Sequence, residues 1–141
     1  MENLLRTLAL DVGTKTIGIA VSDELGITAN GITTIQRKSL KDDLHELDIL
    51  IKEYKPGEIV VGVPYQMDGS VSERGQQILN FAEKIREAFS LPIVLWDESF
   101  STVNAEKKLI EGNMSRKKRK KVIDKIAAVF ILQEYLESKR F

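Results

Sequence analysis

The sequence predicts an α/β fold: a five-stranded mixed sheet, three antiparallel strands followed by parallel strands, flanked by helices. Two β-rich runs, residues 8–10 and 16–21, are separated by a short Gly-containing connection, which is typical of a hairpin. After a third strand, helical stripes alternate with continuous apolar runs, the order expected of parallel strands joined by right-handed crossovers. The length of 141 residues suits one domain with a hydrophobic core, so we expect a single domain over residues 1–141.

Composition and charge narrow the class of protein. Hydrophobic residues make up 43% and charged residues 30% of the chain, as in ordinary globular proteins. The formal net charge is zero, so any attraction to a nucleic acid or a membrane would have to be local. The absence of cysteine excludes disulfides and thiolate metal sites. Because we find neither a secretory signal nor an apolar segment long enough to cross a bilayer, we expect a cytoplasmic protein that makes no membrane contact.

The first strands lead into a helix. The third strand is expected over residues 27–35, with a bulge at Gly31, since glycine inside a strand often marks one. Ser39 is a suitable N-cap for the first helix, which Pro56-Gly57 should end. Its buried stripe repeats every three or four residues: Leu40, Leu44, Leu47, Ile51 and Tyr54. The only histidine, His45, lies among acids on the solvated side of this helix, and we assign it no role.

A parallel strand is expected over residues 58–64, followed by a second helix. Ser70 and Glu73 have the spacing of a capping box, and apolar residues through Phe89 supply the buried stripe. Arg74 falls in the first turn of this helix, where a cation opposes the helix dipole. It is either a surface residue or a contact for a phosphate.

The last strand, residues 91–96, runs straight into Asp97-Glu98. A short helix is expected over residues 103–111, closed by Gly112. A loop of six consecutive cations follows, and then the last helix over residues 122–138. The cations are Arg116, Lys117, Lys118, Arg119, Lys120 and Lys121. Such runs are often merely solvated, but local positive charge in a neutral chain favours binding of a polyanion.

Four acids are candidates for a common site at the edge of the sheet. Asp11 ends the first apolar run, and it is either a turn-capping residue or a functional carboxylate. Asp97 and Glu98 follow an outer parallel strand, and because side chains alternate along a strand, only one should face a common site. Asp124 begins the last helix, one turn before Ala127, and either complements the helix dipole or points inward.

Carboxylates gathered in one cleft repel each other unless cations intervene. Oxygen ligands of this kind suit Mg²⁺ or Mn²⁺, and two such ions could activate a water for phosphodiester cleavage. The sequence therefore predicts a metal-dependent nuclease in which residues 116–121, the basic segment, hold the phosphate backbone.

The chain resembles the YqgF (RuvX) family, the Holliday-junction-resolvase-like nucleases of bacteria, nearly from end to end. The resemblance rests on four motifs in this order: residues 9–20, 61–69 (Val-Gly-Val-Pro and Met-Asp-Gly), 97–103 and 122–128. It implies a ribonuclease H-like fold and a bacterial cytoplasmic protein. It also implies that Asp11, Glu98 and Asp124 are the metal-binding catalytic acids, with Asp97 the weaker alternative.

The resemblance further implies a substrate. The favoured one is structured RNA, at the 5′ end of the small-subunit ribosomal RNA precursor, and the alternative is a four-way DNA junction. The family usually has arginine after the Asp-Glu pair, whereas this chain has Ser99. Lys15, Arg74 or the basic segment could supply the missing positive charge. We therefore expect intact metal binding and weaker cleavage; if Ser99→Arg leaves turnover unchanged, this expectation is wrong.

Two other classes of protein compete with the nuclease. Asp-Val-Gly-Thr before a β-run also resembles the phosphate loop of actin-like ATPases and sugar kinases, which need two such domains to enclose a nucleotide. A non-catalytic RNA-binding module that keeps the acids for docking is the other. Neither the choice between RNA and DNA nor that between monomer and homodimer follows from the sequence.

Overall fold

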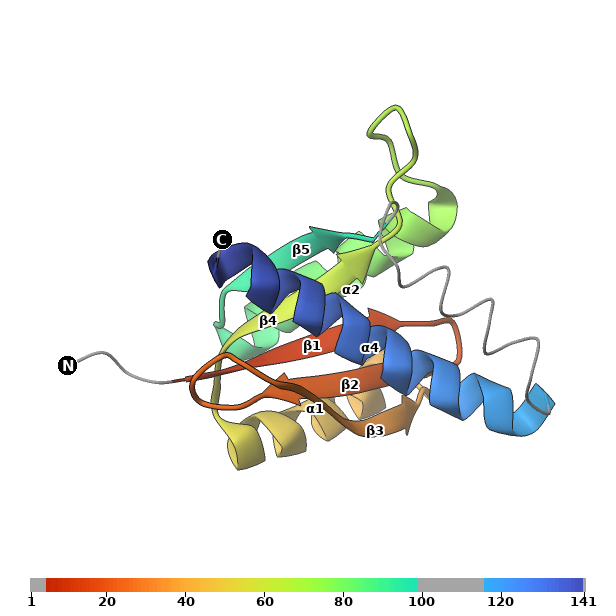
Figure 1. Ribbon diagram of the computed structural model, residues 1–141. Coiled ribbons are helices and arrows are strands. Elements are labelled where there is room, and N and C mark those ends of the chain that lie inside the picture. The colour runs from red at the N-terminus through yellow and green to blue at the C-terminus, as the bar shows by residue number, and fades with distance from the viewer. Residues whose placement is uncertain (1–4, 99–115, 141) are drawn as a thin grey trace.

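The computed structural model (Figure 1) describes residues 5–98 and 116–140, with the backbone alone for residues 116–124. Its elements follow one another along the chain as β1 (Arg6–Val12), β2 (Thr16–Ser22), β3 (Ala29–Gln36), α1 (Leu40–Tyr54), β4 (Pro56–Val63), α2 (Glu73–Phe89), β5 (Ile93–Asp97) and α4 (Arg116–Arg140). No helix in these described ranges is long and apolar enough to cross a membrane.

The five strands form one mixed sheet in the order β3-β2-β1-β4-β5. β1 pairs antiparallel with β2, and β2 pairs antiparallel with β3, whereas β1–β4 and β4–β5 are parallel. This confirms the predicted sheet and places β1 at its centre. The carboxyl ends of β1, β4 and β5 therefore share one edge of the sheet.

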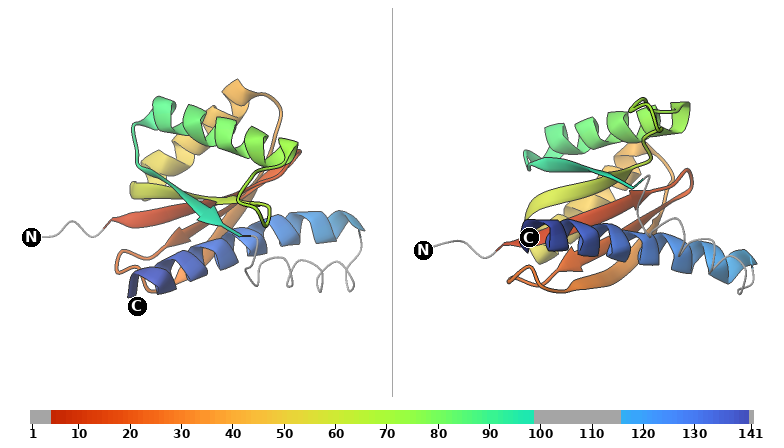
Figure 2. Two further views of the ribbon diagram at one scale, coloured as in Figure 1. Left: turned by 90° about the horizontal axis from the view of Figure 1, so that it is seen from above. Right: turned by 45° about the horizontal axis from the view of Figure 1, so that its top comes forward.

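Helices cover both faces of the sheet. α1 and α2 pack on one face and α4 crosses the other, as both views in Figure 2 show. On the first face, alternate side chains of the central strands form the larger core with Leu47 of α1 and four residues of α2; the strand residues are Leu8, Leu10, Val12, Ile17, Ile19, Val21, Ile59, Val61 and Val63. The near-continuous apolar sequences of these strands follow from this burial on both faces.

The face under α4 is built from small side chains. Ala9, Ala20 and Val60 pack against Ala127 and Ala128, and all five are at most 1% exposed. Small residues on both partners let the helix approach the sheet closely, as expected from the pair of alanines in the sequence. A close-packed helix here leaves water little access to the sheet surface beneath it.

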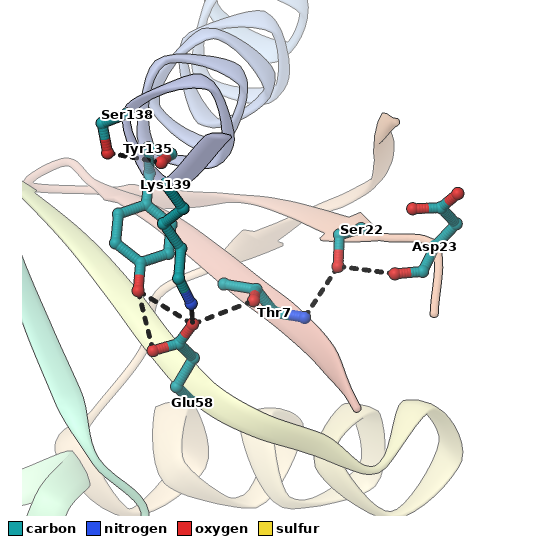
Figure 3. A network of polar contacts seen from close by, with 7 residues as sticks. All are labelled: Thr7, Ser22, Asp23, Glu58, Tyr135, Ser138 and Lys139. Carbon is teal, nitrogen blue, oxygen red and sulfur yellow. Dashed lines mark hydrogen bonds and ion pairs between the residues drawn. The ribbon is translucent and has the colours of Figure 1, made fainter. Parts of the chain in front are cut away.

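The far end of α4 is tied to the sheet by a polar network (Figure 3). The Tyr135 hydroxyl donates to both carboxylate oxygens of Glu58 at 2.8 and 2.9 Å, and Lys139 Nζ reaches the same carboxylate at 3.2 Å. The Thr7 hydroxyl, on β1, also donates to the Glu58 carboxylate. Burial raises the pKa of Tyr135, and so does the adjacent Glu58 carboxylate. These contacts fix α4 where β1 and β4 begin, while its first turns extend toward their carboxyl ends.

Several predicted boundaries are confirmed and two local predictions are wrong. Ser39 caps α1, its hydroxyl accepting from the Asp42 N–H, and the predicted bulge appears where Ala20 pairs with Gly31 after Ile19 pairs with Thr33. The capping-box prediction is wrong because Ser72, not Ser70, caps α2. Ser70 instead bonds within its own loop, donating to Gln66 and Asp68.

The basic segment is the second correction. Residues 116–121 were expected in a loop, but they form the first turns of α4. Asp124 consequently lies in the third turn of that helix rather than the first. Lysine and arginine are good helix formers, so a long helix can extend through such a run. The short helix expected over residues 103–111, Gly112 and Ser99 lie outside the described residues.

Candidate active site

Asp11 occupies the penultimate position of the central strand. It is 6% exposed and pairs with Gly18 of β2. Its neighbours Leu10 and Val12 face the core beneath α1 and α2. Because successive side chains of a strand alternate, Asp11 faces the α4 side of the sheet. A carboxylate is thus held at a buried position near the carboxyl edge.

Glu98 reaches the same face from the other side of β4. It directly follows β5, its N–H donates to the Val63 carbonyl at 3.1 Å, and it is 6% exposed. A Cβ on Gly62 would lie 2.7 Å from Glu98 Oε2 and 2.6 Å from Cδ1 of Ile131, closer than real Cβ contacts allow. The carboxylate therefore occupies space that only glycine at position 62 leaves open.

These two carboxylates are neighbours across the sheet. Leu10 of β1 is in register with Val61 of β4, so the next residues along the parallel strands, Asp11 and Gly62, lie side by side. Adjacent strands are roughly 4.8 Å apart. Since the Glu98 carboxylate lies over Gly62, the two acids occupy neighbouring positions on the same buried face.

The remaining predicted acids are placed differently. Asp97 is exposed at the end of β5, and alternation puts it opposite Trp96, which packs toward α4. Residue 124 lies one helical turn before Ala127 and Ala128 of α4, and its side chain lies outside the described residues. Among the described side chains, no three His, Cys, Asp or Glu residues form a group that could hold a metal ion.

The donor chemistry of Asp11 and Glu98 fits a hard divalent cation. Both supply carboxylate oxygens, the ligands that Mg²⁺ and Mn²⁺ prefer. Two buried carboxylates side by side also repel each other, and a cation between them would relieve this repulsion. Asp11 and Glu98 therefore fit a divalent cation in the type of their donor atoms and in their shared location.

Two arginines brace the turn that follows Asp11. Arg74 Nη2 donates to the Val12 carbonyl at 2.6 Å, and Arg37 Nη1 donates to the Gly13 carbonyl at 2.8 Å. Burial lowers the pKa of Arg74, the Arg37 charge lowers it further, and the Asp11 charge raises it. Asp11 thus has a cation within electrostatic reach, as a buried carboxylate requires.

Sequence reasoning singled out Arg74 and missed Arg37. Arg37 follows β3 and precedes the cap of α1, and it is held by Asp43 (Nε to Oδ2, 2.9 Å) and by the face of Phe81. Arg37 forms no recognisable sequence motif with either of these partners, so no signal in the sequence indicated its role. Lys15, also predicted to contact nucleic acid, is exposed in the β1–β2 turn at the same edge. The side chains of the basic segment lie outside the described residues.

Comparison with known proteins identifies the family of this chain. The family model described as "RuvX: Holliday junction resolvase" matches residues 5–138. A protein of Geobacillus kaustophilus named "Putative pre-16S rRNA nuclease" is 55% identical over 138 residues, which cover 96% of this chain and all of the relative. A protein of the same name from Thermoanaerobacter pseudethanolicus is 51% identical, covering 96% of this chain and 99% of its own.

A solved structure shares the fold at low identity. RuvC of T. thermophilus, solved in complex with a Holliday junction substrate, aligns with a TM-score of 0.57 and 10% identity over 96% of each chain. This likeness shows the fold alone, a ribonuclease H-like arrangement of mixed sheet and flanking helices. With its sequence matched almost throughout by the family model and by relatives at half identity, the chain belongs to the RuvX family.

Proposed function

We propose that this protein is a metal-dependent nuclease that hydrolyses phosphodiester bonds at the carboxyl edge of its sheet. The observation that carries the proposal is the buried pair of carboxylates on one face of the sheet: Asp11 lies on β1, and the Glu98 carboxylate lies over Gly62 of the neighbouring strand β4. Burying two like charges side by side is unfavourable, and a divalent cation bound between them would offset their repulsion. Resolvase-type nucleases generally use divalent metal ions, which supports the assignment.

We assign the metal ligands to Asp11, Glu98 and Asp124. When bound, two Mg²⁺ or Mn²⁺ ions would supply an activated water and stabilise the leaving oxygen. Asp11 and Glu98 contribute rigid ligands because one belongs to the central strand and the other is tied to β4 through Val63. Asp124 would join them from α4, whose close packing limits access of bulk water to this face.

Cations of the same edge would hold the nucleic acid. Lys15 is exposed in the β1–β2 turn, and Arg74 is anchored beside the turn that follows Asp11. We assign both to phosphate contacts, together with the basic segment at the start of α4. Contacts of this kind position a strand without reading its sequence.

The favoured substrate is the 5′ end of the small-subunit ribosomal RNA precursor. The names of relatives that share half of the sequence over nearly the whole chain support it. A second candidate is the four-way DNA junction, which the description of the matched family favours. Trimming an RNA end needs one site, whereas resolving a junction needs a symmetric dimer, so monomer and homodimer correspond to the two substrates.

The test combines matched substrates with single-atom changes of the acids. Cleavage of RNA, duplex DNA and a four-way junction is measured with Mg²⁺ and with Mn²⁺, for the wild type, Asp11→Asn, Glu98→Gln and Asp124→Asn. We expect each variant to lose cleavage by orders of magnitude while its circular dichroism spectrum and Tm stay close to those of the wild type. Asp97→Asn is the matched control, because Asp97 adjoins Glu98 but is exposed.

Two results would overturn the proposal. Wild-type cleavage by all three acid variants would show that the carboxylates do not carry the chemistry. Metal-independent cleavage, unchanged by a chelator, would show that they do not act through a cation. Tight binding of RNA without cleavage under any metal would instead indicate a binding module.

A further inference from the structure

A second site lies at the same edge of the sheet, on the side of α1 and α2. It is a cavity of about 480 Å³ between the β1–β2 turn, the start of α1 and the start of α2. Arg37, Lys38 and Arg74 line it, against a single carboxylate, Asp43. In a chain of zero net charge, three cations around one cavity mark a local excess of positive charge.

The two guanidinium groups are held in place rather than extended into solvent. Arg37 donates to Asp43 and to the Gly13 carbonyl, and Arg74 donates to Gln77 and to the Val12 carbonyl. Their charges are close enough to oppose each other, since Arg37 helps to lower the pKa of Arg74. Asp43 pairs with Arg37, and Asp11 acts on Arg74 only through its charge, so an anion bound between the two guanidinium groups would relieve the repulsion that remains.

The start of α1 adds to the preference for an anion. Ser39 and Leu40 line the same cavity, and the positive end of the α1 dipole lies at this point. Thr14 brings a hydroxyl from the β1–β2 turn. A planar guanidinium recognises phosphate through paired hydrogen bonds, and Lys38 offers a point charge beside it.

The position of the cavity indicates which phosphate it would take. Its arginines hold the carbonyls of Val12 and Gly13, the two residues directly after Asp11. A phosphate in the cavity would thus be separated from the carboxylate pair only by the β1–β2 turn. A strand whose scissile phosphate lies at Asp11 could continue over this turn and place a neighbouring phosphate between the arginines.

We propose that the cavity bounded by Arg37, Lys38 and Arg74 binds a phosphate group of the substrate strand next to the one that is cleaved. This rests on the proposed function and deepens it, because it assigns a second phosphate contact that fixes the strand relative to the acids. The phosphate is either an internal phosphodiester or a terminal monophosphate, which share the same chemistry.

The experiment measures binding without cleavage. The full chain in EDTA is titrated with a fluorescent single-stranded RNA, with and without a 5′-phosphate, over a series of salt concentrations. Arg74→Gln and Lys38→Gln each remove one cation, and Lys84→Gln is the matched control, an exposed lysine farther along α2. Arg74→Lys keeps the charge, so it separates loss of charge from loss of the contact with Val12.

We expect Arg74→Gln to weaken binding about 3- to 10-fold near 0.1 M salt. The slope of log affinity against log salt should become shallower by about 0.7 for one lost phosphate contact. Lys38→Gln should show the same trend, Arg74→Lys should keep most of the slope, and Lys84→Gln should match the wild type. Losses with both RNAs identify an internal phosphate; losses confined to the 5′-phosphorylated RNA identify a terminal one.

Equal affinities and slopes for the wild type, Arg74→Gln and Lys38→Gln would overturn the inference, even if cleavage confirms the proposed function. If the wild type binds no RNA in EDTA, titration with inorganic phosphate tests the cavity by itself, and the cleavage assays with Mg²⁺ and Mn²⁺ decide the proposed function separately. A saturable shift of the Thr14 and Ser39 amide resonances that Arg74→Gln abolishes would support an anion site. No shift in the wild type would remove it.

Discussion

Gly62 is the position at which packing and the proposed chemistry depend on the same missing side chain. Alanine there would place a Cβ 2.7 Å from Glu98 Oε2 and 2.6 Å from Cδ1 of Ile131. Contacts below 3.0 Å force something to move. Ile131 is fully buried against the sheet, so the helix cannot yield freely, and the carboxylate must be displaced.

The cost of Gly62→Ala follows from overpacking a close-packed core, about 1–3 kcal/mol of unfolding free energy. For a domain of this size that corresponds to a fall in Tm of roughly 3 to 10 °C. Displacing Glu98 should also weaken binding of Mn²⁺ about tenfold or more, as when the support of a metal ligand is disturbed. Urea unfolding gives the first quantity, and calorimetric titration with Mn²⁺ gives the second.

A second substitution separates the two effects. Gly62→Ala with Ile131→Val removes the Cδ1 atom that meets the new methyl but leaves the Glu98 contact in place. We expect the double variant to regain most of the stability and none of the metal affinity. Gly31→Ala is the matched control, because its Cβ meets only the flexible chain of exposed Lys125 beneath the same helix. Wild-type stability and Mn²⁺ affinity in Gly62→Ala would refute the placement of Glu98.

Two further predictions concern the scaffold. Tyr135→Phe should cost about 1–2 kcal/mol, since it removes the hydroxyl that donates to Glu58. The folded state raises the pKa of Tyr135 above its ordinary 10.0, so this stabilisation is complete below pH 10 and declines as pH rises through the folded-state pKa. In urea unfolding, Tyr135→Phe should therefore lose less stability above pH 10 than the wild type. Parallel pH profiles of the two proteins would contradict this. Arg37→Met should lower the free energy of unfolding by about 3 kcal/mol, because it leaves Asp43, which is 2% exposed, without its ion pair. The double variant Arg37→Met with Asp43→Asn should recover part of that loss. If Arg37→Met alone is as stable as the wild type, the prediction is wrong.

The elements that were predicted correctly carry strong local signals. The hairpin, the alternation of strands and helices and the cap at Ser39 depend on neighbouring residues, and each is found in the structure. The errors lie where local signals compete. Ser70 and Ser72 both precede Glu73, and only the course of the preceding loop decides which one caps α2.

The start of α4 shows the same limit in another way. A run of six cations, residues 116–121, has a composition that suits a solvated loop as well as a helix. In the structure the helix continues through it, while its later turns are fixed by burial against the sheet and by the bond from Tyr135 to Glu58. Packing downstream therefore supported a helix that the composition of its first turns did not specify.

By itself, the sequence determined the order of strands and helices, the central position of Asp11 and the acids that could act with it. Hydrophobic periodicity and turn formation depend on residues close together in the sequence, so they can be recognised without the tertiary structure. The family resemblance had favoured Glu98 over Asp97. Only the tertiary structure decided that the Glu98 carboxylate lies over Gly62 beside Asp11, and that Arg37 joins Arg74 at the turn after Asp11. These are contacts between strands and helices far apart along the chain, and their geometry arises from sheet register and helix packing.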